Sequence, residues 1–219
     1  MSDGFHPPLE EYLEAIAELE EENVPVIQAR LAERLEHTPA SVSEMIHRLR
    51  DEGFIIIDGR AISLTDVGRE RAESVVRKHR LAERLLTDII GLPWSQSHLE
   101  ACRWEHVISD QVEERLVALL GNPTTCPHGN PIPGTTPNPA TQVPLSDCDV
   151  GDQMHLTRVT ERVEIDTEAL AYLDAANLRP GASAAITARA PDGTLTIDVD
   201  GASVALGASL TSQIYVTVD

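Results

Sequence analysis

A segment rich in proline, glycine and asparagine, residues 121–148, separates two parts of the chain that have different hydrophobic periodicities. Before it, apolar residues recur at intervals of three and four, which is typical of amphipathic helices. After it, apolar and polar residues alternate, which is typical of half-buried strands. This change of period predicts an α+β protein of several domains, with a helical amino-terminal part and a β-rich carboxy-terminal part.

The first 64 residues predict a compact module of three helices and a β-hairpin. A first helix should begin at the Pro7-Pro8 pair and end before Asn23, and further helices are expected over residues 27–36 and 41–52. Residues 37–40 separate these two helices as a short turn, and Ser41 to Glu44 is a good capping sequence. Strands at residues 54–57 and 61–64 then flank Asp58-Gly59, a strong hairpin turn signal. This order is the winged helix-turn-helix arrangement.

The charge distribution bears on whether this module binds DNA. The net charge of -19 by itself argues against a nucleic-acid partner. Residues 27–80, however, carry ten basic and nine acidic side chains, whereas residues 1–26 carry eight acids and no Lys or Arg. Helix-turn-helix units also occur in proteins that bind no DNA, but the least acidic segment coincides with this module, so we expect double-stranded DNA as a partner.

The expected DNA contacts fall into two groups. Polar residues at the start of the third helix are placed to contact DNA, namely Thr38, Ser41, Ser43 and Glu44. Glu44 could accept from a cytosine amino group or be a solvated helix residue. Contacts to phosphates or the minor groove are expected from Arg30, Arg34, Arg48, Arg50 and Arg60.

Two longer helices are predicted next, over residues 65–90 and 95–120. In the second, His98, Cys102, Glu105 and His106 are spaced i, i+4, i+7 and i+8, so they should share one face. All four are metal-ligand types, where a purely structural face would carry aliphatic residues. His79 and Glu83 share a face of the preceding helix. The surplus of apolar residues on these helices favours a homodimer, with packing inside one chain as the alternative.

The carboxy-terminal part predicts a small β-barrel over residues 148–219, with one short helix at 167–176. No apolar run is long enough to cross a membrane, and the amino terminus lacks the pattern of a signal peptide. The three cysteines include no C-x-x-C pair, which suits a reducing compartment. We therefore expect a cytoplasmic protein with no membrane partner.

Three motifs resemble the diphtheria toxin repressor family of iron- or manganese-dependent transcriptional regulators. They are KHRLAERLLTDIIGL at residues 78–92, EACRWEHV at 100–107 and PHGNPIPG at 127–134. The resemblance covers nearly the whole chain. It implies a winged helix-turn-helix domain, a helical dimerisation and metal-binding domain, a Pro-rich linker and an SH3-like domain, with expected ranges 1–72, 73–121, 122–147 and 148–219.

The resemblance also implies two metal sites in each subunit. The regulatory site is similar to Cys102, Glu105 and His106, completed from the first helix by Glu11, where iron-responsive members have methionine. Manganese-responsive members have a carboxylate there but a glutamate in place of the cysteine, so the site is a hybrid. Glu14, one turn after Glu11, is a further candidate ligand.

The ancillary site implied by the resemblance comprises His79, Glu83, His98, Glu161 and Glu164. Arg80 and Asn130 match family residues that bind an anion beside that metal. Some manganese-type members use a Cys and a His of the same loop as ligands, and Cys126 and His128 fit that pattern. The alternative for this pair is a small buried thiol and a surface imidazole.

The resemblance and the ligand types together predict a metal-dependent repressor of metal-homeostasis genes, not an enzyme. A thiolate, an imidazole and two carboxylates suit a borderline divalent ion. We lean to Mn(II), with Fe(II) a close second, because Glu11 hardens the site; Co(II), Ni(II) or Zn(II) could substitute in vitro. The expected DNA partner is a palindromic operator that holds one homodimer or two. The competing hypotheses are a binuclear metal-dependent hydrolase, for which no H-E-x-x-H motif is present, and a metal-storage or redox protein.

Overall fold

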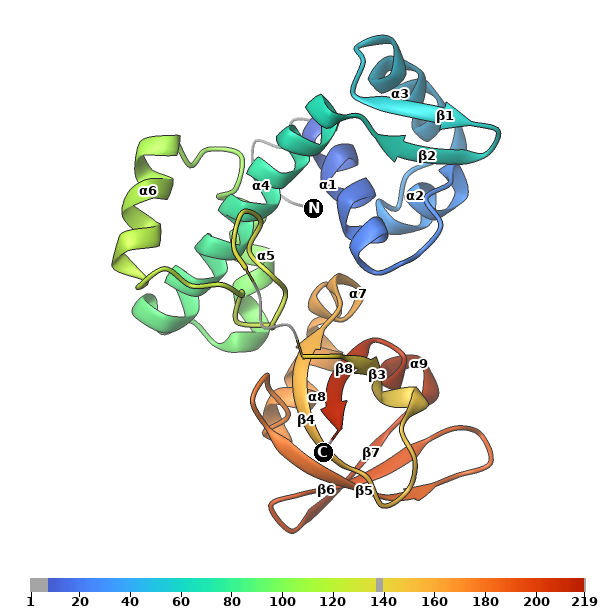
Figure 1. The fold of residues 1–219 in the computed structure, drawn as a ribbon, viewed down its shortest axis with the longest axis vertical. Helices are drawn as coiled ribbons and strands as arrows, with labels where there is room; N and C mark the ends of the chain where they lie inside the picture. Colours follow the sequence, from blue (N-terminus) through green and yellow to red (C-terminus); the bar gives the residue numbers. More distant parts are fainter. Residues whose placement is uncertain (1–7, 137–139, 219) are drawn as a thin grey trace. The chain divides into compact units, whose positions relative to one another are not determined.

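The computed structural model describes residues 8–136 and 140–218. The chain divides into two compact units, of which the first comprises Met1–His79 and Cys102–Arg115 and the second Arg80–Ala101 and Leu116–Asp219. Helices dominate the amino-terminal part of the chain and strands the carboxy-terminal part (Figure 1). The predicted α+β class is confirmed. In the described part of the chain, no helix is both long enough and apolar enough to span a membrane.

The first unit contains the predicted winged helix-turn-helix. Its elements are α1 (Pro8–Glu21), α2 (Gln28–Arg34), α3 (Pro39–Asp51), β1 (Ile55–Asp58) and β2 (Ala61–Leu64). The helices form because apolar residues at helical spacing can be buried together, and Leu13, Ile16, Leu31, Ile46 and Leu49 make the centre of this core. The strands pair as an antiparallel hairpin that forms the wing.

Two local details of this module differ from the predictions. Helix α3 begins at Pro39, because the Thr38 hydroxyl caps it by accepting from the Ser41 N–H at 3.2 Å. Pro39 suits the first turn because its missing N–H has no partner there. In the hairpin, Asp58 pairs with Ala61, so the turn residues are Gly59 and Arg60, not Asp58 and Gly59. Gly59 adopts a φ of 60°, which glycine tolerates at the first position of such a turn.

The long helix predicted over residues 65–90 is present, but its last part changes type. It comprises α4 (Asp66–Arg84), followed by the π-helical turn η1 (Leu85–Ile90). Gly91, with a φ of 80°, ends it in the left-handed conformation common after helices.

The single helix predicted over residues 95–120 is wrong. The structure has η2 (Trp94–Gln96), α5 (Ser97–Ala101), a run of turns at residues 102–107, and α6 (Asp110–Leu119). The Ser109 hydroxyl accepts from the Val112 N–H at 3.4 Å and so helps to start α6. Helical spacing therefore does not align Cys102, Glu105 and His106, and their placement depends on tertiary contacts instead.

The β domain in the second unit has a six-stranded antiparallel sheet with the order β3-β8-β4-β5-β6-β7. The strands are β3 (Val143–Pro144), β4 (Gln153–Val159), β5 (Ser183–Arg189), β6 (Leu195–Val199), β7 (Ala202–Leu206) and β8 (Ile214–Val218). Its core includes Leu156, Leu170, Ile186 and Ile197. Short helices fill the connections: η3 (Leu145–Asp147), α7 (Glu161–Glu164), α8 (Thr167–Ala175) and α9 (Ala208–Thr211). The helix predicted at 167–176 is thus confirmed as α8.

Much of the segment expected to be a Pro-rich linker packs into the second unit. Cys126, His128, Asn130 and Ile132 are buried there. Gly129 has a φ of 92°, and a Cβ at this position would lie 2.0 Å from the carbonyl oxygen of Thr157 on β4, so only glycine permits this approach. Residues 137–139 of the expected linker lie outside the described residues.

Candidate metal centre

A first group of ligand-type side chains lies within the first unit. Glu14 on α1 and Glu105 and His106 from the turns after α5 place their ligand atoms within 4.8 Å of one another. Glu105 is buried and its carboxylate lies 2.5 Å from Nδ1 of His79 and 3.0 Å from Nε2 of His106. We call Glu14, His79, Cys102, Glu105 and His106 the first-unit cluster.

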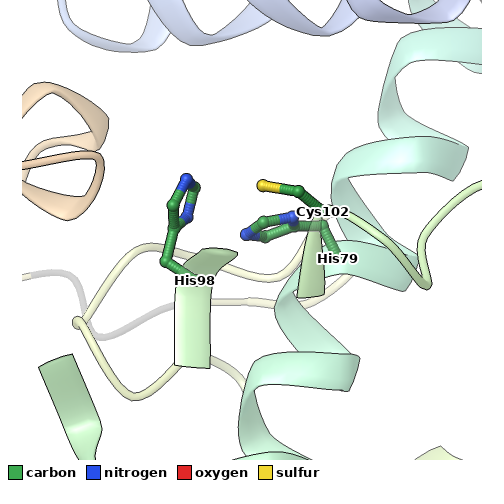
Figure 2. Close-up of side chains that lie close together, drawn as sticks. All are labelled: His79, His98 and Cys102. Carbon is green, nitrogen blue, oxygen red and sulfur yellow. The ribbon is translucent and has the colours of Figure 1, made fainter. Parts of the chain in front are cut away.

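The cluster joins the DNA-binding module to the segment that follows α5. Figure 2 shows the Cys102 thiol beside the His79 imidazole, and the sulfur and a ring nitrogen lie within 4.8 Å. Resemblance placed His79 with the ancillary ligands, whereas its Nδ1 contacts Glu105 of the expected regulatory set. Three parts of the chain distant in sequence, α1, α4 and the turns at 102–107, therefore meet here.

Charges within the first-unit cluster depend on one another. Burial raises the pKa of Glu14 well above its ordinary value, and the Glu105 charge raises it further. Burial acts in the same direction on Glu105, but bonds from His106 and His79 outweigh it and bring the Glu105 pKa below its ordinary value. The site thus holds one carboxylate, Glu105, that two imidazoles stabilise, and a second, Glu14, for which burial outweighs the contribution of His79.

The structure distinguishes the acidic residues of α1. Glu14 is grouped with Glu105 and His106, and Glu10 lies with its carboxylate 2.7 Å from Nδ1 of His106. Glu11, the carboxylate that resemblance favoured, is partly buried on the same helix but is not in that group. Sequence reasoning missed Glu10, since nothing in a run of closely spaced acids tells which one faces His106.

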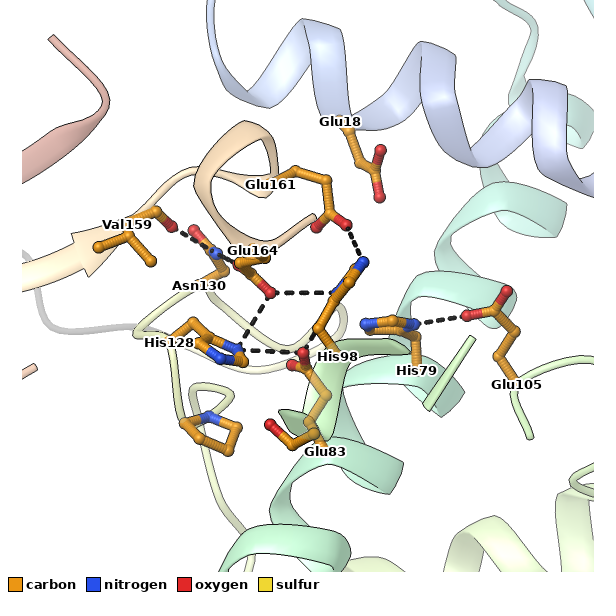
Figure 3. Close-up of polar contacts among 12 residues, drawn as sticks. Glu18, His79, Glu83, His98, Glu105, His128, Asn130, Val159, Glu161 and Glu164 are labelled. Atoms are coloured by element: carbon orange, nitrogen blue, oxygen red, sulfur yellow. Dashed lines mark hydrogen bonds and ion pairs between the residues drawn. The ribbon is translucent and has the colours of Figure 1, made fainter. Parts of the chain in front are cut away.

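A second group lies within the second unit, where Glu83, His128 and Glu164 face one another (Figure 3). Glu83 from α4, Cys126 and His128 from the following loop, and Glu164 from α7 place their ligand atoms within 4.8 Å of one another. None of the four is more than 1% exposed. We call these four residues the second-unit cluster.

His98 and Glu161 extend this cluster. Nδ1 of His98 lies 3.5 Å from Glu83 and 3.4 Å from Glu164, and its Nε2 lies 3.0 Å from Glu161 (Figure 3). Five expected ancillary residues, namely Glu83, His98, His128, Glu161 and Glu164, are therefore connected by these contacts, with Cys126 beside them.

The surroundings of His128 fix which of its nitrogens faces the cluster. Nε2 lies 3.2 Å from the Trp94 carbonyl oxygen, which can only accept, so Nε2 carries a proton. The Trp94 ring lies against the imidazole at a centroid distance of 4.8 Å and an interplanar angle of 44°, and its Nε1 donates to the Pro127 carbonyl. In the neutral imidazole, Nδ1 then presents a lone pair to Glu83 and Glu164. Sequence reasoning missed Trp94, because a tryptophan 34 positions away carries no signal of this role.

The geometry of the second-unit cluster fits a bound cation. Nδ1 of His128 lies 3.0 Å from an oxygen of Glu83 and of Glu164, yet it has no hydrogen-bond partner in suitable alignment among the described residues. Two buried carboxylates at one point require positive charge. Burial raises the pKa of the Cys126 thiol to about 11, and the charges of Glu83 and Glu164 contribute to the rise. Thiolate, imidazole and carboxylate donors converging in this way suit a transition-metal ion.

The expected anion residues have partners within the protein. The Asn130 amide nitrogen donates to the Val159 carbonyl oxygen at 2.8 Å and to the Glu164 carboxylate. Arg80 is buried and donates to the Pro131 carbonyl oxygen.

Most expected DNA-contact residues are exposed on the winged helix-turn-helix. Thr38, Ser41 and Glu44 are exposed at the start of α3, Ser43 is partly buried, and Arg60 is exposed in the wing turn. Arg30, Arg48 and Arg50 are also exposed, although each pairs with an acidic side chain within four positions along the chain. Arg34 is largely covered and binds Glu18 and Glu22, which indicates a structural role.

A winged helix-turn-helix that shares its first helix with a cluster of metal-ligand side chains defines the class of metal-responsive DNA-binding regulators. Three family descriptions match along the chain: "Iron dependent repressor, N-terminal DNA binding domain" at residues 5–61, "Iron dependent repressor, metal binding and dimerisation domain" at 65–134, and "FeoA domain" at 143–218. The chain belongs to the iron-dependent repressor family that includes the diphtheria toxin repressor. It is a metal-dependent DNA-binding transcriptional repressor and not an enzyme.

One sequence relative is named for iron, whereas one structural relative is named for manganese. The chain is 44% identical over 204 residues to the iron-dependent repressor IdeR of Mycobacterium tuberculosis, covering 88% of each chain. It is 41% identical over 207 residues to the diphtheria toxin repressor of Corynebacterium diphtheriae, covering 90% of this chain and 91% of the other. A manganese-dependent transcriptional repressor in complex with manganese aligns with a TM-score of 0.86 at 32% identity, covering 96% of this chain and 100% of that one.

Proposed function

We propose that this protein represses metal-homeostasis genes when it binds Mn(II), with Fe(II) as the alternative metal. The observation that carries the proposal is the second-unit cluster, in which Glu83, Cys126, His128 and Glu164 converge in a fully buried position. Such a set of side chains has a high cost in the absence of a cation, and a repressor scaffold gives that cation a regulatory use.

The choice of metal follows from the donor atoms. Two carboxylates in each cluster favour Mn(II), since hard oxygen ligands suit it, whereas Cys102 and Cys126 favour softer ions. The names of the sequence relatives point to iron, and the structural relative above is named for manganese. Mn(II) and Fe(II) both bind weakly in the divalent series, so availability in the cell contributes to the choice. Co(II), Ni(II) and Zn(II) are expected to substitute in vitro.

We assign two sites to each subunit. The regulatory site comprises Cys102, Glu105 and His106 with a carboxylate of α1, for which Glu11 and Glu14 are the candidates. The ancillary site comprises the second-unit cluster with His98 and Glu161, and His79 is shared between the two assignments. The four-domain division at residues 72, 121 and 147 is kept as part of this proposal.

The first-unit cluster suggests how metal binding controls DNA binding. A divalent cation supplies positive charge that offsets the carboxylates of Glu14 and Glu105. Those residues then hold α1, and with it the helix-turn-helix, against the turns that precede α6. In a homodimer this connection would favour one spacing of the two recognition helices, and hence the DNA-binding state.

A dimer has support in the exposed apolar surface of the second unit. Ile89 and Ile90 in η1 are each 56% exposed and Leu99 in α5 is 47% exposed. Burying such residues against a second copy is favourable. The proposed operator is a palindrome that accommodates one dimer or two. Because the operator is chromosomal DNA, the protein is expected to act in the cytoplasm.

The decisive experiment is a DNA-binding titration under anaerobic conditions, with operator fragments selected from random sequence. Mn(II) should raise the affinity for DNA at lower free concentration than Fe(II) does. Activation by Fe(II) at lower free concentration would make the protein an iron sensor, and tight binding to DNA without metal would contradict the proposal. Winged-helix variants Ser41→Ala and Arg60→Ala should lose DNA affinity while their metal binding is unchanged.

A further inference from the structure

Asn130 is connected both to the loop that carries Cys126 and His128 and to the carboxylate of Glu164. Its main-chain oxygen accepts from the Cys126 N–H at 2.8 Å, and the Gly129 N–H donates to the Cys126 carbonyl at 3.0 Å, which closes a tight turn. Its side-chain nitrogen donates to the Glu164 carboxylate and, at 2.8 Å, to the Val159 carbonyl. Asn130 thus contacts the loop that carries Cys126, strand β4 through Val159, and helix α7 through Glu164.

The bond from Asn130 constrains how Glu164 faces the cluster. The amide binds Oε1 of Glu164, while Oε2 lies 3.0 Å from Nδ1 of His128 and 3.4 Å from Nδ1 of His98 (Figure 3). Because the amide holds one oxygen of the carboxylate, the other oxygen keeps a fixed direction toward the cluster. Hydrogen-bond partners of this kind fix the orientation of ligands in metal sites.

The β domain in turn holds Asn130. Arg158 on β4 donates from its guanidinium to Oδ1 of Asn130 at 3.2 Å, and its guanidinium carbon lies 3.9 Å from the centre of the Tyr215 ring on β8. The Val159 N–H donates to the His128 carbonyl at 3.0 Å, next to the bond that Val159 accepts from Asn130. Arg158 and Asn130 are only 9% and 2% exposed, so these bonds are shielded from water.

We propose that Asn130 is a positioning residue for Glu164, itself held by Arg158 and Tyr215, and that its amide is therefore not a site for an external anion. Both amide protons of Asn130 are used inside the protein, so an anion could bind there only by displacing Glu164. Metal binding at the second-unit cluster is therefore independent of added oxyanion. This inference rests on the proposed function, since it concerns a ligand of that metal site.

A double-mutant cycle on the full chain tests the proposal. Mn(II) dissociation constants would be measured by competition with a chelating dye for wild type, Asn130→Ala, Glu164→Ala and the double variant. Asn130→Ala should weaken binding about 10- to 100-fold, the usual cost of losing an outer partner of a ligand, and should cost almost nothing more when Glu164 is already Ala. A loss that persists in the Glu164→Ala background would mean that Asn130 acts only by shaping the loop, and would overturn the proposal.

If Asn130→Ala does not fold, the Arg158→Lys variant and a comparison of two salts on the wild-type protein test the proposal instead. Arg158→Lys keeps the charge but loses the planar group that stacks on Tyr215, and its smaller loss should also vanish in the Glu164→Ala background. In wild type, Mn(II) affinity should be the same in sodium sulfate and in sodium chloride of equal ionic strength, whereas tighter binding in sulfate would overturn the proposal.

The experiment also needs a control variant, and its outcomes must distinguish this proposal from the proposed function. Asn177→Gly changes an exposed asparagine of the same unit whose φ of 55° glycine tolerates, and it should leave Mn(II) affinity unaltered. A wild type that binds no divalent ion would overturn both this proposal and the proposed function. A wild type that binds Mn(II), combined with additive effects at Asn130 and Glu164, would overturn this proposal alone.

Discussion

The two clusters contain the same kinds of donor, yet their environments differ. In the first-unit cluster Cys102 is partly exposed, and two histidines stabilise the Glu105 carboxylate. In the second-unit cluster all four side chains are buried, and the loop that carries two of them is pinned to β4. Under the proposed function, the second-unit cluster is therefore the preorganised metal site, whereas the first-unit cluster depends on how α1 meets the turns after α5.

The largest expected effect is on the buried cluster. His128→Ala removes a ligand rather than its outer partner, and outer partners alone are worth about 10- to 100-fold in affinity, so we expect a loss above that range. Isothermal titration with Mn(II) should then find one fewer site per chain. His155→Ala, at an exposed histidine of β4, is the matched control. An unchanged stoichiometry would remove the buried cluster from the list of metal sites.

The next effect separates the two candidate carboxylates of α1. Glu14→Ala should weaken Mn(II)-dependent DNA binding by more than about tenfold, because Glu14 is grouped with Glu105 and His106 and even an outer partner of a ligand is worth about 10- to 100-fold in metal affinity. Glu11→Ala should have a smaller effect. Fluorescence anisotropy with a labelled operator measures both. The reverse order would restore Glu11 as the ligand that resemblance favoured.

The thiols offer a more moderate spectroscopic comparison. Co(II) bound by thiolate shows charge-transfer absorption, so Cys126→Ser and Cys102→Ser should each remove about half of it if each site has one thiolate. Cys148 lies in the apolar core of the β domain and Cys148→Ala should change nothing in the spectrum. Absorption that survives intact in Cys102→Ser would make the first-unit cluster an oxygen and nitrogen site.

The smallest effect concerns pH and the metal-free protein. Burial by itself lowers the pKa of His128, but the Glu164 and Glu83 charges outweigh it and hold that pKa well above its ordinary value. The folded protein therefore binds this proton more tightly than the unfolded chain does. The resulting stabilisation is complete below about pH 6.5, the ordinary histidine pKa, and is lost as pH rises through the raised pKa.

Urea unfolding at a series of pH values would measure this loss. His128→Asn should flatten the decline in the free energy of unfolding above neutral pH, whereas His155→Asn should leave the decline as in wild type. Saturating Mn(II) should abolish the decline, because the cation replaces the proton as the source of positive charge. A His128→Asn profile that parallels wild type would assign the decline to other groups.

The sequence by itself determined the order and type of most elements. Apolar spacing placed α1 to α4, the hairpin and α8 close to their observed bounds, because these elements form wherever a repeating apolar face can be buried. The residue types at positions 79, 83, 98, 102, 105 and 106 also identified the metal-binding character. Helix and strand preferences and the ligand chemistry of a side chain depend on short stretches of sequence, so both can be predicted without knowing the fold.

Only the tertiary structure decided which side chains meet. The break after Ala101 could not be predicted, because the run to residue 120 has no Gly or Pro. In the turns at 102–107, Glu105 contacts His79 of α4 and His106 contacts Glu10 of α1. The segment read as a linker supplies Cys126, His128 and Asn130 through a turn that Gly129 allows to approach β4. Such contacts join residues dozens of positions apart, and spacing along the chain carries no record of them.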